Sequence, residues 1–275
     1  MSSAFSRGLP RLGQGTWYMG EGEVPPEQEA DALRLGLDLG MTLIDTAEMY
    51  GNGGAERVVG RALAGRRDGV LLVSKVLPAN ASRASLPKAC AASLKRLGTN
   101  WIDLYLLHWR GRTPLAETAE AFERLRDAGH IRAWGVSNFD VDDMAELPPG
   151  CAANQILYNL ENRGPEFDLL PWLQQHAMAT MAYSPLGQAR GLLQHRTLAE
   201  VAGRHSIGAK PATPAQIALA FTLARRGVCA IPKASTAAHV RENAAADMLR
   251  LSAEDLTALD RAFPPPRRKV PLAML

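Results

Sequence analysis

The sequence is poor in the features that mark several large classes of protein. Among its 275 residues there are three cysteines, 6% are aromatic, and basic and acidic residues nearly balance at 31 and 28. Cys90, Cys151 and Cys229 lie far apart without paired spacing, so we expect a reducing compartment and neither a disulfide framework nor a zinc site. The dispersed net charge of +3 forms no basic stripe, so we expect no nucleic-acid partner.

Long apolar runs and phosphate-binding glycine loops are also missing. No run approaches the roughly 18 apolar residues of a membrane span, and the first ten residues lack the apolar core of a signal peptide. The stretch Gly13-Gln14-Gly15-Thr16-Trp17 lacks the third glycine of a Rossmann fingerprint, and the six histidines have no metal-binding spacing. We therefore expect a cytoplasmic protein with no membrane partner and no metal.

Apolar, strand-like runs alternate with helical patterns about eight times along the chain. Near-continuous apolar strands are typical of a parallel sheet covered on the outside, and eight such periods favour a closed (β/α)₈ TIM barrel, an α/β fold, over an open sheet. An α/β barrel commonly uses about 250 residues as one domain, so we expect residues 1–275 to form a single domain with a tail at 264–275. The expected strands are 12–17, 42–46, 70–75, 102–108, 131–136, 152–157, 179–184 and 228–232.

The expected helices are bounded by capping residues and glycines. Ser85, Thr213 and Ser252 stand at expected N-caps, and glycines follow several expected helix ends. The longest connection, 185–227, has the pattern of an extra short helix. The helices are expected at 27–39, 55–63, 86–97, 114–128, 198–205, 214–226 and 253–262.

Four polar residues stand at or just beyond the ends of three successive expected strands. Asp45 lies near the end of the second strand and Tyr50 just beyond it, Lys75 ends the third, and His108 ends the fourth. Parallel strands end at one rim of the barrel, where α/β barrels build active sites. The pattern therefore indicates an enzyme whose site contains these four side chains.

Their chemistry fits protonation of a carbonyl oxygen. A tyrosine hydroxyl titrates near pH 10, and an ammonium about 4 Å away at an effective dielectric near 20 is worth roughly 4 kcal/mol, or about three pKa units. We expect Lys75 to bring the Tyr50 hydroxyl close to the operating pH, with Asp45 keeping the buried ammonium charged. His108 could then orient the carbonyl oxygen by a hydrogen bond.

Each of the four residues taken singly also suits a structural role, such as a cap, a packed ring or a satisfied core histidine. Two other functions stay open on the residues alone. One is a Schiff-base lyase or aldolase that uses Lys75 as the nucleophile, because strand-end lysines in barrels do this chemistry. The other is a non-catalytic cofactor-binding subunit on the same fold.

Seven stretches of the chain, in order, resemble the signature motifs of the aldo-keto reductase family, and most closely those of its compact prokaryotic members. The stretches begin at Ile44, Ser74, Asp103, Gly135, Asn154, Ala182 and Ile231. They read Ile-Asp-Thr-Ala with Tyr50-Gly51, Ser-Lys, Asp-Leu-Tyr-Leu-Leu-His-Trp, Gly-Val-Ser-Asn-Phe, Asn-Gln, Ala-Tyr-Ser-Pro-Leu-Gly and Ile-Pro-Lys.

The resemblance implies a (β/α)₈ barrel that reduces aldehydes or ketones with hydride from NADPH, bound without a Rossmann domain. It implies that Tyr50 is the general acid, that Lys75 and Asp45 tune it, and that His108 orients the carbonyl. The implied coenzyme contacts are Thr16 and Trp17, then Ser137, Asn138 and Gln155 at the carboxamide, Tyr183 stacked on the nicotinamide, Ser184, Pro185 and Leu186 along the pyrophosphate, and Lys233, Ser235, His239, Glu242 and Asn243 around the adenosine.

One departure from the family pattern concerns the coenzyme. Many members carry serine after the Pro-Lys pair and arginine six residues after the lysine, whereas Ala234 and His239 stand here. Arginine grips phosphate bidentately and stays charged, while histidine is mostly neutral at pH 7, so we expect a weaker clamp on the 2′-phosphate. NADPH remains the expected coenzyme, with NADH possible.

A second departure from the family pattern, and the residues expected in the pocket wall, both concern the choice of substrate. Tyr158-Asn159-Leu160 follows the Asn-Gln pair where some members have His-Pro, which alters a loop near the pocket. Trp17 and Trp109 are expected to form an aromatic wall above the four polar residues, suited to aldehydes and small ketones. We expect a monomer with a small-molecule carbonyl substrate.

Overall fold

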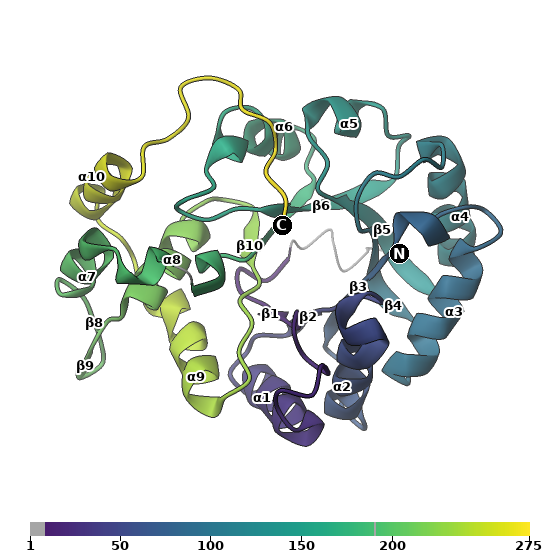
Figure 1. Cartoon of the computed structure of the whole chain (residues 1–275), viewed down its shortest axis with the longest axis horizontal. Helices are drawn as coiled ribbons and strands as arrows, with labels where there is room; N and C mark the ends of the chain where they lie inside the picture. Colours follow the sequence, from purple (N-terminus) through teal and green to yellow (C-terminus); the bar gives the residue numbers. More distant parts are fainter. Residues whose placement is uncertain (1–8, 190) are drawn as a thin grey trace.

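The computed structural model describes residues 9–189 and 191–275, and in it eight parallel strands form one closed barrel surrounded by helices (Figure 1). Neighbouring strands pair in sequence order, and the first and last are joined by backbone bonds from Gly13 N to the Ala230 oxygen (2.8 Å) and from Gly15 N to the Pro232 oxygen (2.9 Å). The expected (β/α)₈ barrel is confirmed. Its strands are β1 (Gln14–Gly15), β2 (Leu43–Asp45), β3 (Leu71–Val76), β4 (Ile102–Leu107), β5 (Ile131–Ser137), β6 (Cys151–Leu157), β7 (Ala179–Tyr183) and β10 (Val228–Ala230).

The helices begin and end close to the expected positions. Thr213 and Ser252 cap their helices through side-chain bonds to backbone N–H groups, as expected. Ser85 does not: its own N–H donates to the Ser82 hydroxyl at 3.2 Å, so Ser82 organises that turn. The helices are α1 (Pro26–Asp38), α2 (Gly54–Leu63), α3 (Leu86–Leu97), α4 (Leu115–Asp127), α5 (Val141–Ala145), α6 (Leu169–Gln175), α7 (Arg196–Ala202), α8 (Pro214–Leu223), α9 (Ala237–Ala245) and α10 (Ala253–Ala262).

Three small elements were not expected from the sequence. Helices α5 and α6 are only five and seven residues long, too short for a helical period to stand out. A hairpin of β8 (Ser206–Ile207) and β9 (Lys210–Pro211) follows α7 outside the barrel. None of the described helices is long and apolar enough to cross a membrane.

The barrel interior explains why the polar residues stand at strand ends. Leu43, Val73, Leu104, Leu106, Ala153 and Met181 belong to one buried cluster that fills the barrel. Successive strand residues point to opposite faces, so the residue two positions later points inward again, now at the rim. Two positions after Leu43, Val73 and Leu106 stand Asp45, Lys75 and His108. The alternation of side chains along each strand thus places apolar residues inside the barrel and polar residues at its rim.

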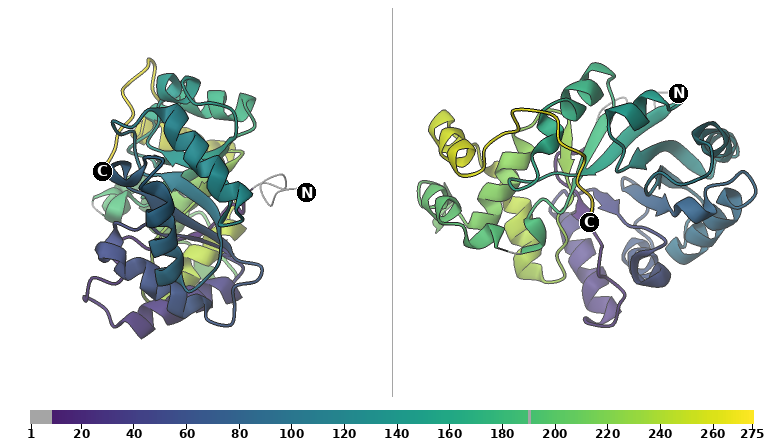
Figure 2. Two further views of the ribbon diagram at one scale, coloured as in Figure 1. Left: turned by 90° about the vertical axis from the view of Figure 1, so that its right-hand side faces the viewer. Right: turned by 45° about the horizontal axis from the view of Figure 1, so that its top comes forward.

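The chain after α10 returns over the same rim. Residues 264–275 have neither helix nor strand, and in Figure 1 they arch from α10 to the centre of the barrel mouth. In the left view of Figure 2 their end lies at the edge of the molecule that faces the viewer in Figure 1, and in the right view it lies near the centre.

Candidate active site

Lys75 is the centre of a buried polar cluster at the rim. Its side chain is completely buried, and its ammonium donates to Asp45 Oδ2 at 2.7 Å, to the backbone oxygen of Thr46 at 2.9 Å and to the Tyr50 hydroxyl oxygen at 3.1 Å. An ammonium has three protons, so all of its donors are used. The strand ends of β2 and β3, together with the turn that carries Tyr50, bring these groups together.

The charges in this cluster oppose the cost of burial. Burial disfavours the Lys75 ammonium, but Asp45 and Tyr50 outweigh that effect and raise the pKa of Lys75 above its ordinary value. For Asp45 burial is the larger effect and raises its pKa, although Lys75 and a hydrogen bond from Gln155 lower it. The ion pair is therefore held by mutual attraction inside a poorly solvated site.

The expected pKa of Tyr50 is wrong in direction. Burial raises the pKa of Tyr50 above its ordinary value of 10.0, because the loss of solvation outweighs the attraction of Lys75 for the phenolate. The hydroxyl is thus protonated at neutral pH, ready to give a proton, and the ammonium lies where the resulting phenolate would need stabilisation. The sequence argument counted the neighbouring charge and left the burial out.

His108 faces the same space as a neutral ring. Burial, and after it the charge of Lys75, lower the pKa of His108 to about 3. The imidazole meets the Tyr50 ring edge to face at 5.8 Å, and its buried Nδ1 has no hydrogen-bond partner among the described residues. If Nδ1 is the unprotonated nitrogen, the ring proton is on Nε2.

Two hollows meet at Tyr50. The first, here called the groove, has a volume of about 280 Å³, and its lining includes Trp17, Tyr18, the residues 184–186 and Lys233. The second, here called the cavity, has a volume of about 290 Å³. The cavity is lined by Trp17, Met49, Tyr50, His108, Trp109, Ser137, Asn138, Gln155, Tyr183, Met274 and Leu275.

The three expected carboxamide contacts, Ser137, Asn138 and Gln155, all line the cavity. Hydrogen bonds connect them to one another and to the neighbouring backbone. The Ser137 hydroxyl donates to the Gln155 backbone oxygen (2.8 Å), and the Asn138 amide nitrogen donates to Ser137 Oγ (3.2 Å) and to the His108 backbone oxygen (3.1 Å). Gln155 Nε2 donates to Asp45 Oδ1 at 2.7 Å, a role that was not expected. Tyr183, at the boundary of groove and cavity, donates its hydroxyl to Asn138 Oδ1 at 2.8 Å.

The other expected coenzyme residues divide into two sets. Thr16, Trp17, Ser184, Pro185, Leu186 and Lys233 line the groove, although the Thr16 hydroxyl is buried and donates to the Asp45 backbone oxygen at 2.9 Å. Ser235, His239, Glu242 and Asn243 lie beyond the residues that line it. Glu242 accepts a hydrogen bond from Thr213 Oγ1 at 2.6 Å, while His239 is exposed and Asn243 is buried on α9.

Of two further residues that shape the groove, Glu29 was missed from the sequence and Asn159 was noted only as part of a departure near the pocket. The buried Glu29 accepts the backbone N–H of Gly20 at 2.8 Å and so holds the loop that carries Trp17. The Asn159 side chain donates to the backbone oxygen of Ser184 at 2.9 Å, where the chain has a φ of 47°. Gly20 has a φ of +72° and lies so close to Gly54 that a side chain there would clash, and neither feature can be read from the sequence alone.

The described residues contain no group of three or more histidine, cysteine or acidic side chains arranged to hold a metal ion. The cysteines Cys90, Cys151 and Cys229 are buried and unpaired, and none of them lines the groove or the cavity.

Comparison with known proteins gives one consistent answer. The model of the aldo/keto reductase family matches residues 11–263. Methylglyoxal reductase YeaE of Escherichia coli (strain K12) is 53% identical over 97% of this chain and 95% of its own length. A crystal structure of an aldo/keto reductase from Klebsiella pneumoniae in complex with NADP and acetate has a TM-score of 0.93 and 52% identity, covering 97% of this chain and 96% of that one. A second structure from that organism, in complex with NADPH, has the same TM-score and identity, with coverages of 97% and 95%. The chain belongs to the aldo/keto reductase family.

Proposed function

We propose that this protein reduces small 2-oxoaldehydes such as methylglyoxal with NADPH, and that Tyr50 is the proton donor. The family to which it belongs makes it an NAD(P)H-dependent oxidoreductase that converts carbonyl groups to alcohols. The observation that carries the proposal is the position of Lys75 Nζ, which lies 2.7 Å from Asp45 and 3.1 Å from the hydroxyl of Tyr50, a residue that lines both the groove and the cavity.

The residues around the two hollows fit a nicotinamide coenzyme. Tyr183 offers a ring at the boundary between groove and cavity, and Asn138 and Gln155 lie beside it. Both hydrogens of the Asn138 amide are already donated, which leaves its carbonyl oxygen and that of Gln155 as acceptors for a carboxamide NH₂ group. Trp17, Ser184 and Pro185 would border the pyrophosphate, and Lys233 would face the 2′-phosphate.

The proposed chemistry divides between coenzyme and protein. NADPH, when bound, supplies the hydride to the carbonyl carbon. Tyr50 gives its proton to the carbonyl oxygen, and the Lys75 ammonium stabilises the phenolate that remains. Neutral His108 can donate a hydrogen bond to the same oxygen, because an imidazole with a pKa of about 3 does not compete for the proton at neutral pH.

The cavity and a close relative together support the substrate class. A volume of about 290 Å³ walled by Trp17 and Trp109 suits a small carbonyl compound that carries an apolar substituent. The relative that is 53% identical over nearly the whole chain is named a methylglyoxal reductase.

The Schiff-base alternative is not favoured. A lysine that attacks a carbonyl must be neutral, whereas the pKa of Lys75 is raised and all three of its protons are donated to Asp45, Thr46 and Tyr50. A non-catalytic role is not favoured either, because all four expected catalytic residues are present and gathered at one rim.

We further infer that the chain works as a monomer of one domain, with residues 264–275 as its tail, and that it acts in the cytoplasm. Three buried cysteines without disulfides are consistent with a reducing compartment.

Coenzyme oxidation followed at 340 nm tests the proposal, with NADPH and NADH each offered methylglyoxal, simple aldehydes and ketones. We expect turnover of methylglyoxal with NADPH and formation of the corresponding alcohol. Absence of NADPH oxidation with every carbonyl would contradict the proposed function, and trapping of a borohydride adduct on Lys75 would favour the lyase instead.

A further inference from the structure

The tail is fastened at its middle by Lys269. The Lys269 ammonium lies 3.1 Å from Asp168 Oδ2 and 3.5 Å from Asp140 Oδ2. Asp140 stands directly before α5 and Asp168 directly before α6, so the lysine bridges the loops that follow two neighbouring strands. The side chains of Lys269, Asp168 and Asp140 are 39%, 31% and 24% exposed. These two ion pairs, here called the clasp, therefore lie at the surface, where dissolved salt screens them.

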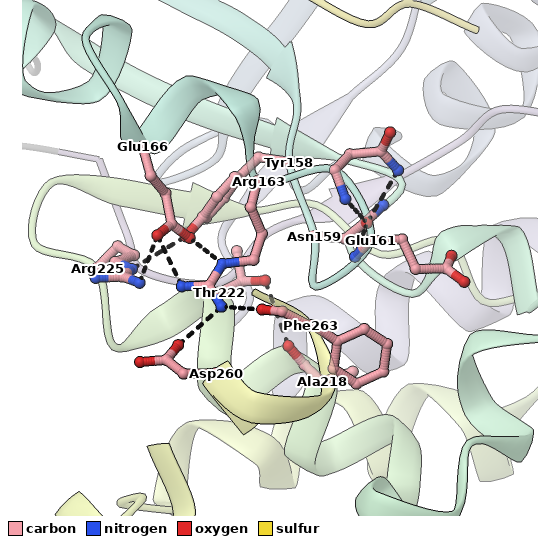
Figure 3. Close-up of polar contacts among 11 residues, drawn as sticks. Tyr158, Asn159, Glu161, Arg163, Glu166, Ala218, Thr222, Arg225, Asp260 and Phe263 are labelled. Atoms are coloured by element: carbon pink, nitrogen blue, oxygen red, sulfur yellow. Dashed lines mark hydrogen bonds and ion pairs between the residues drawn. The ribbon is translucent and has the colours of Figure 1, made fainter. Parts of the chain in front are cut away.

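The base of the tail is fastened separately and inside the protein. Arg163, only 4% exposed, donates to Asp260 Oδ1 at 2.8 Å and to the backbone oxygen of Phe263, and it pairs with Glu166 (Figure 3). Phe263 immediately precedes the run Pro264-Pro265-Pro266. The direction in which the tail leaves α10 is therefore fixed before Lys269 is reached.

The end of the tail forms part of the cavity wall. Leu272 packs against the core, and Met274 and Leu275 line the same cavity as Tyr50 and His108. Met274 is 56% exposed, so the described contacts hold it weakly. Only four residues separate Lys269 from Met274, and the ion pairs of Lys269 are the last ones before the cavity wall.

We propose that Lys269 is a specificity-determining positioning residue: its clasp on Asp168 and Asp140 holds Met274 and Leu275 against the substituent of the substrate. The inference rests on the proposed function. The tail has no backbone pairing, so it gains conformational freedom when the ion pairs of Lys269 are removed. Met274 and Leu275 then spend less time at the cavity wall. The methyl group of methylglyoxal is small, whereas the phenyl ring of phenylglyoxal has far more apolar surface to place against the tail.

Replacement of Lys269 by methionine tests this. For phenylglyoxal we expect kcat/KM to fall about three- to fivefold, mostly through KM. Fivefold is about 1 kcal/mol, the upper value for an ion pair exposed to solvent. For methylglyoxal we expect a change below about twofold, and NADPH affinity and Tm should stay at the wild-type values. Lys88→Met, which removes an exposed lysine on α3, is the matched control and should change neither substrate.

Two further arms separate positioning from a general structural effect. Lys269→Arg keeps the charge and should restore the phenylglyoxal constant to within about twofold of wild type. Raising NaCl from 0.05 to 0.5 M should increase the phenylglyoxal KM of the wild type and leave that of Lys269→Met nearly constant, because only the former has a clasp to screen.

An unchanged ratio of phenylglyoxal to methylglyoxal activity in Lys269→Met would overturn the inference, as would equal losses on both substrates. Failure of the proposed function looks different: wild-type protein would then oxidise NADPH with neither 2-oxoaldehyde.

Discussion

The charged side chains near the two ends of the groove differ in burial and in pairing. At one end Asp45 and Lys75 are 2% and 0% exposed, and every proton of the ammonium has an acceptor in the protein. At the other end Lys233 and His239 are exposed, and the Lys233 ammonium donates a long hydrogen bond to Ser235 Oγ at 3.4 Å. The protein thus pairs its buried charges with one another and leaves Lys233 and His239 in water, where we propose that they face the phosphate of the coenzyme.

The difference has an energetic consequence. Charges inside a poorly solvated site interact strongly, and removing one leaves the other unpaired at a cost of several kcal/mol. Exposed charges are screened by water and salt and act mainly on the ligand that they meet. Changes at the buried end should therefore alter the chemical step and stability, and changes at the exposed end should alter the choice of coenzyme.

Lys75→Met attacks the buried end most severely. We expect carbonyl reduction to fall by about 10² to 10⁴ and the free energy of unfolding to drop by about 3–5 kcal/mol, because Asp45 is left buried without its cation. Without Lys75 the pKa of Asp45 rises further, so the folded state binds a proton more readily than the unfolded chain. The stability deficit should therefore shrink as pH falls, which urea unfolding at pH 5 and pH 8 would reveal.

The control for this variant is the double change Lys75→Met with Asp45→Asn. It removes the unpaired carboxylate, so we expect stability to recover while reduction stays low. A double variant as active as wild type would show that the ammonium has no part in the chemistry.

His108→Asn tests the neutral orienting group. We expect kcat/KM to fall by about 10- to 100-fold, the range for loss of one hydrogen-bond donor to the reacting oxygen. The pKa of His108 is about 3, so its proton does not titrate between pH 5 and 8, and the pH profiles of variant and wild type should be parallel there. The exposed His130→Asn is the matched control. An ionisation near pH 6.5 that disappears with His108 would contradict the neutral ring.

Lys233→Met probes the exposed end. We expect NADPH to bind about 10- to 100-fold more weakly, as for loss of a hydrogen bond between two charged groups, while NADH affinity changes little. Fluorescence titration of both coenzymes measures this. Equal losses for the two would place Lys233 away from the 2′-phosphate.

His239→Arg should have the smallest effect and the opposite sign. A permanent guanidinium at this position on α9 is expected to tighten NADPH binding by about 2- to 30-fold at pH 7 and to leave NADH nearly unchanged. His239 lies beyond the residues that line the groove, so this substitution also measures whether α9 reaches the coenzyme. No change with NADPH would mean that it does not.

The sequence predicted the buried end well because one physical pattern determines it. Alternation along β2, β3 and β4 sets an apolar residue inside the barrel and a polar one at the rim, so Asp45, Lys75 and His108 could be placed together from strand ends alone. The caps at Thr213 and Ser252 are equally local. Both depend on residues that are close in the sequence.

What the sequence did not predict depends on contacts between distant residues. Gln155 and Asp45 are 110 residues apart, and their hydrogen bond exists only because β2 and β6 face each other across a closed barrel. The direction of the Tyr50 pKa depends on how deeply the hydroxyl is buried, which no neighbouring residue in the sequence reveals. The course of the tail is likewise set by Asp140, Asp168 and Arg163, far from it along the chain.

The central claim, that the buried end does the chemistry through Tyr50, is tested most directly by single-turnover stopped-flow of Tyr50→Phe loaded with saturating NADPH and mixed with methylglyoxal. We predict that the rate of coenzyme oxidation falls at least 10²-fold from wild type, and by a similar factor with NADH, because the proton donor is lost with either coenzyme. The dissociation constants of both coenzymes should stay at the wild-type values. A Tyr50→Phe protein that oxidises bound NADPH at the wild-type rate would contradict the account.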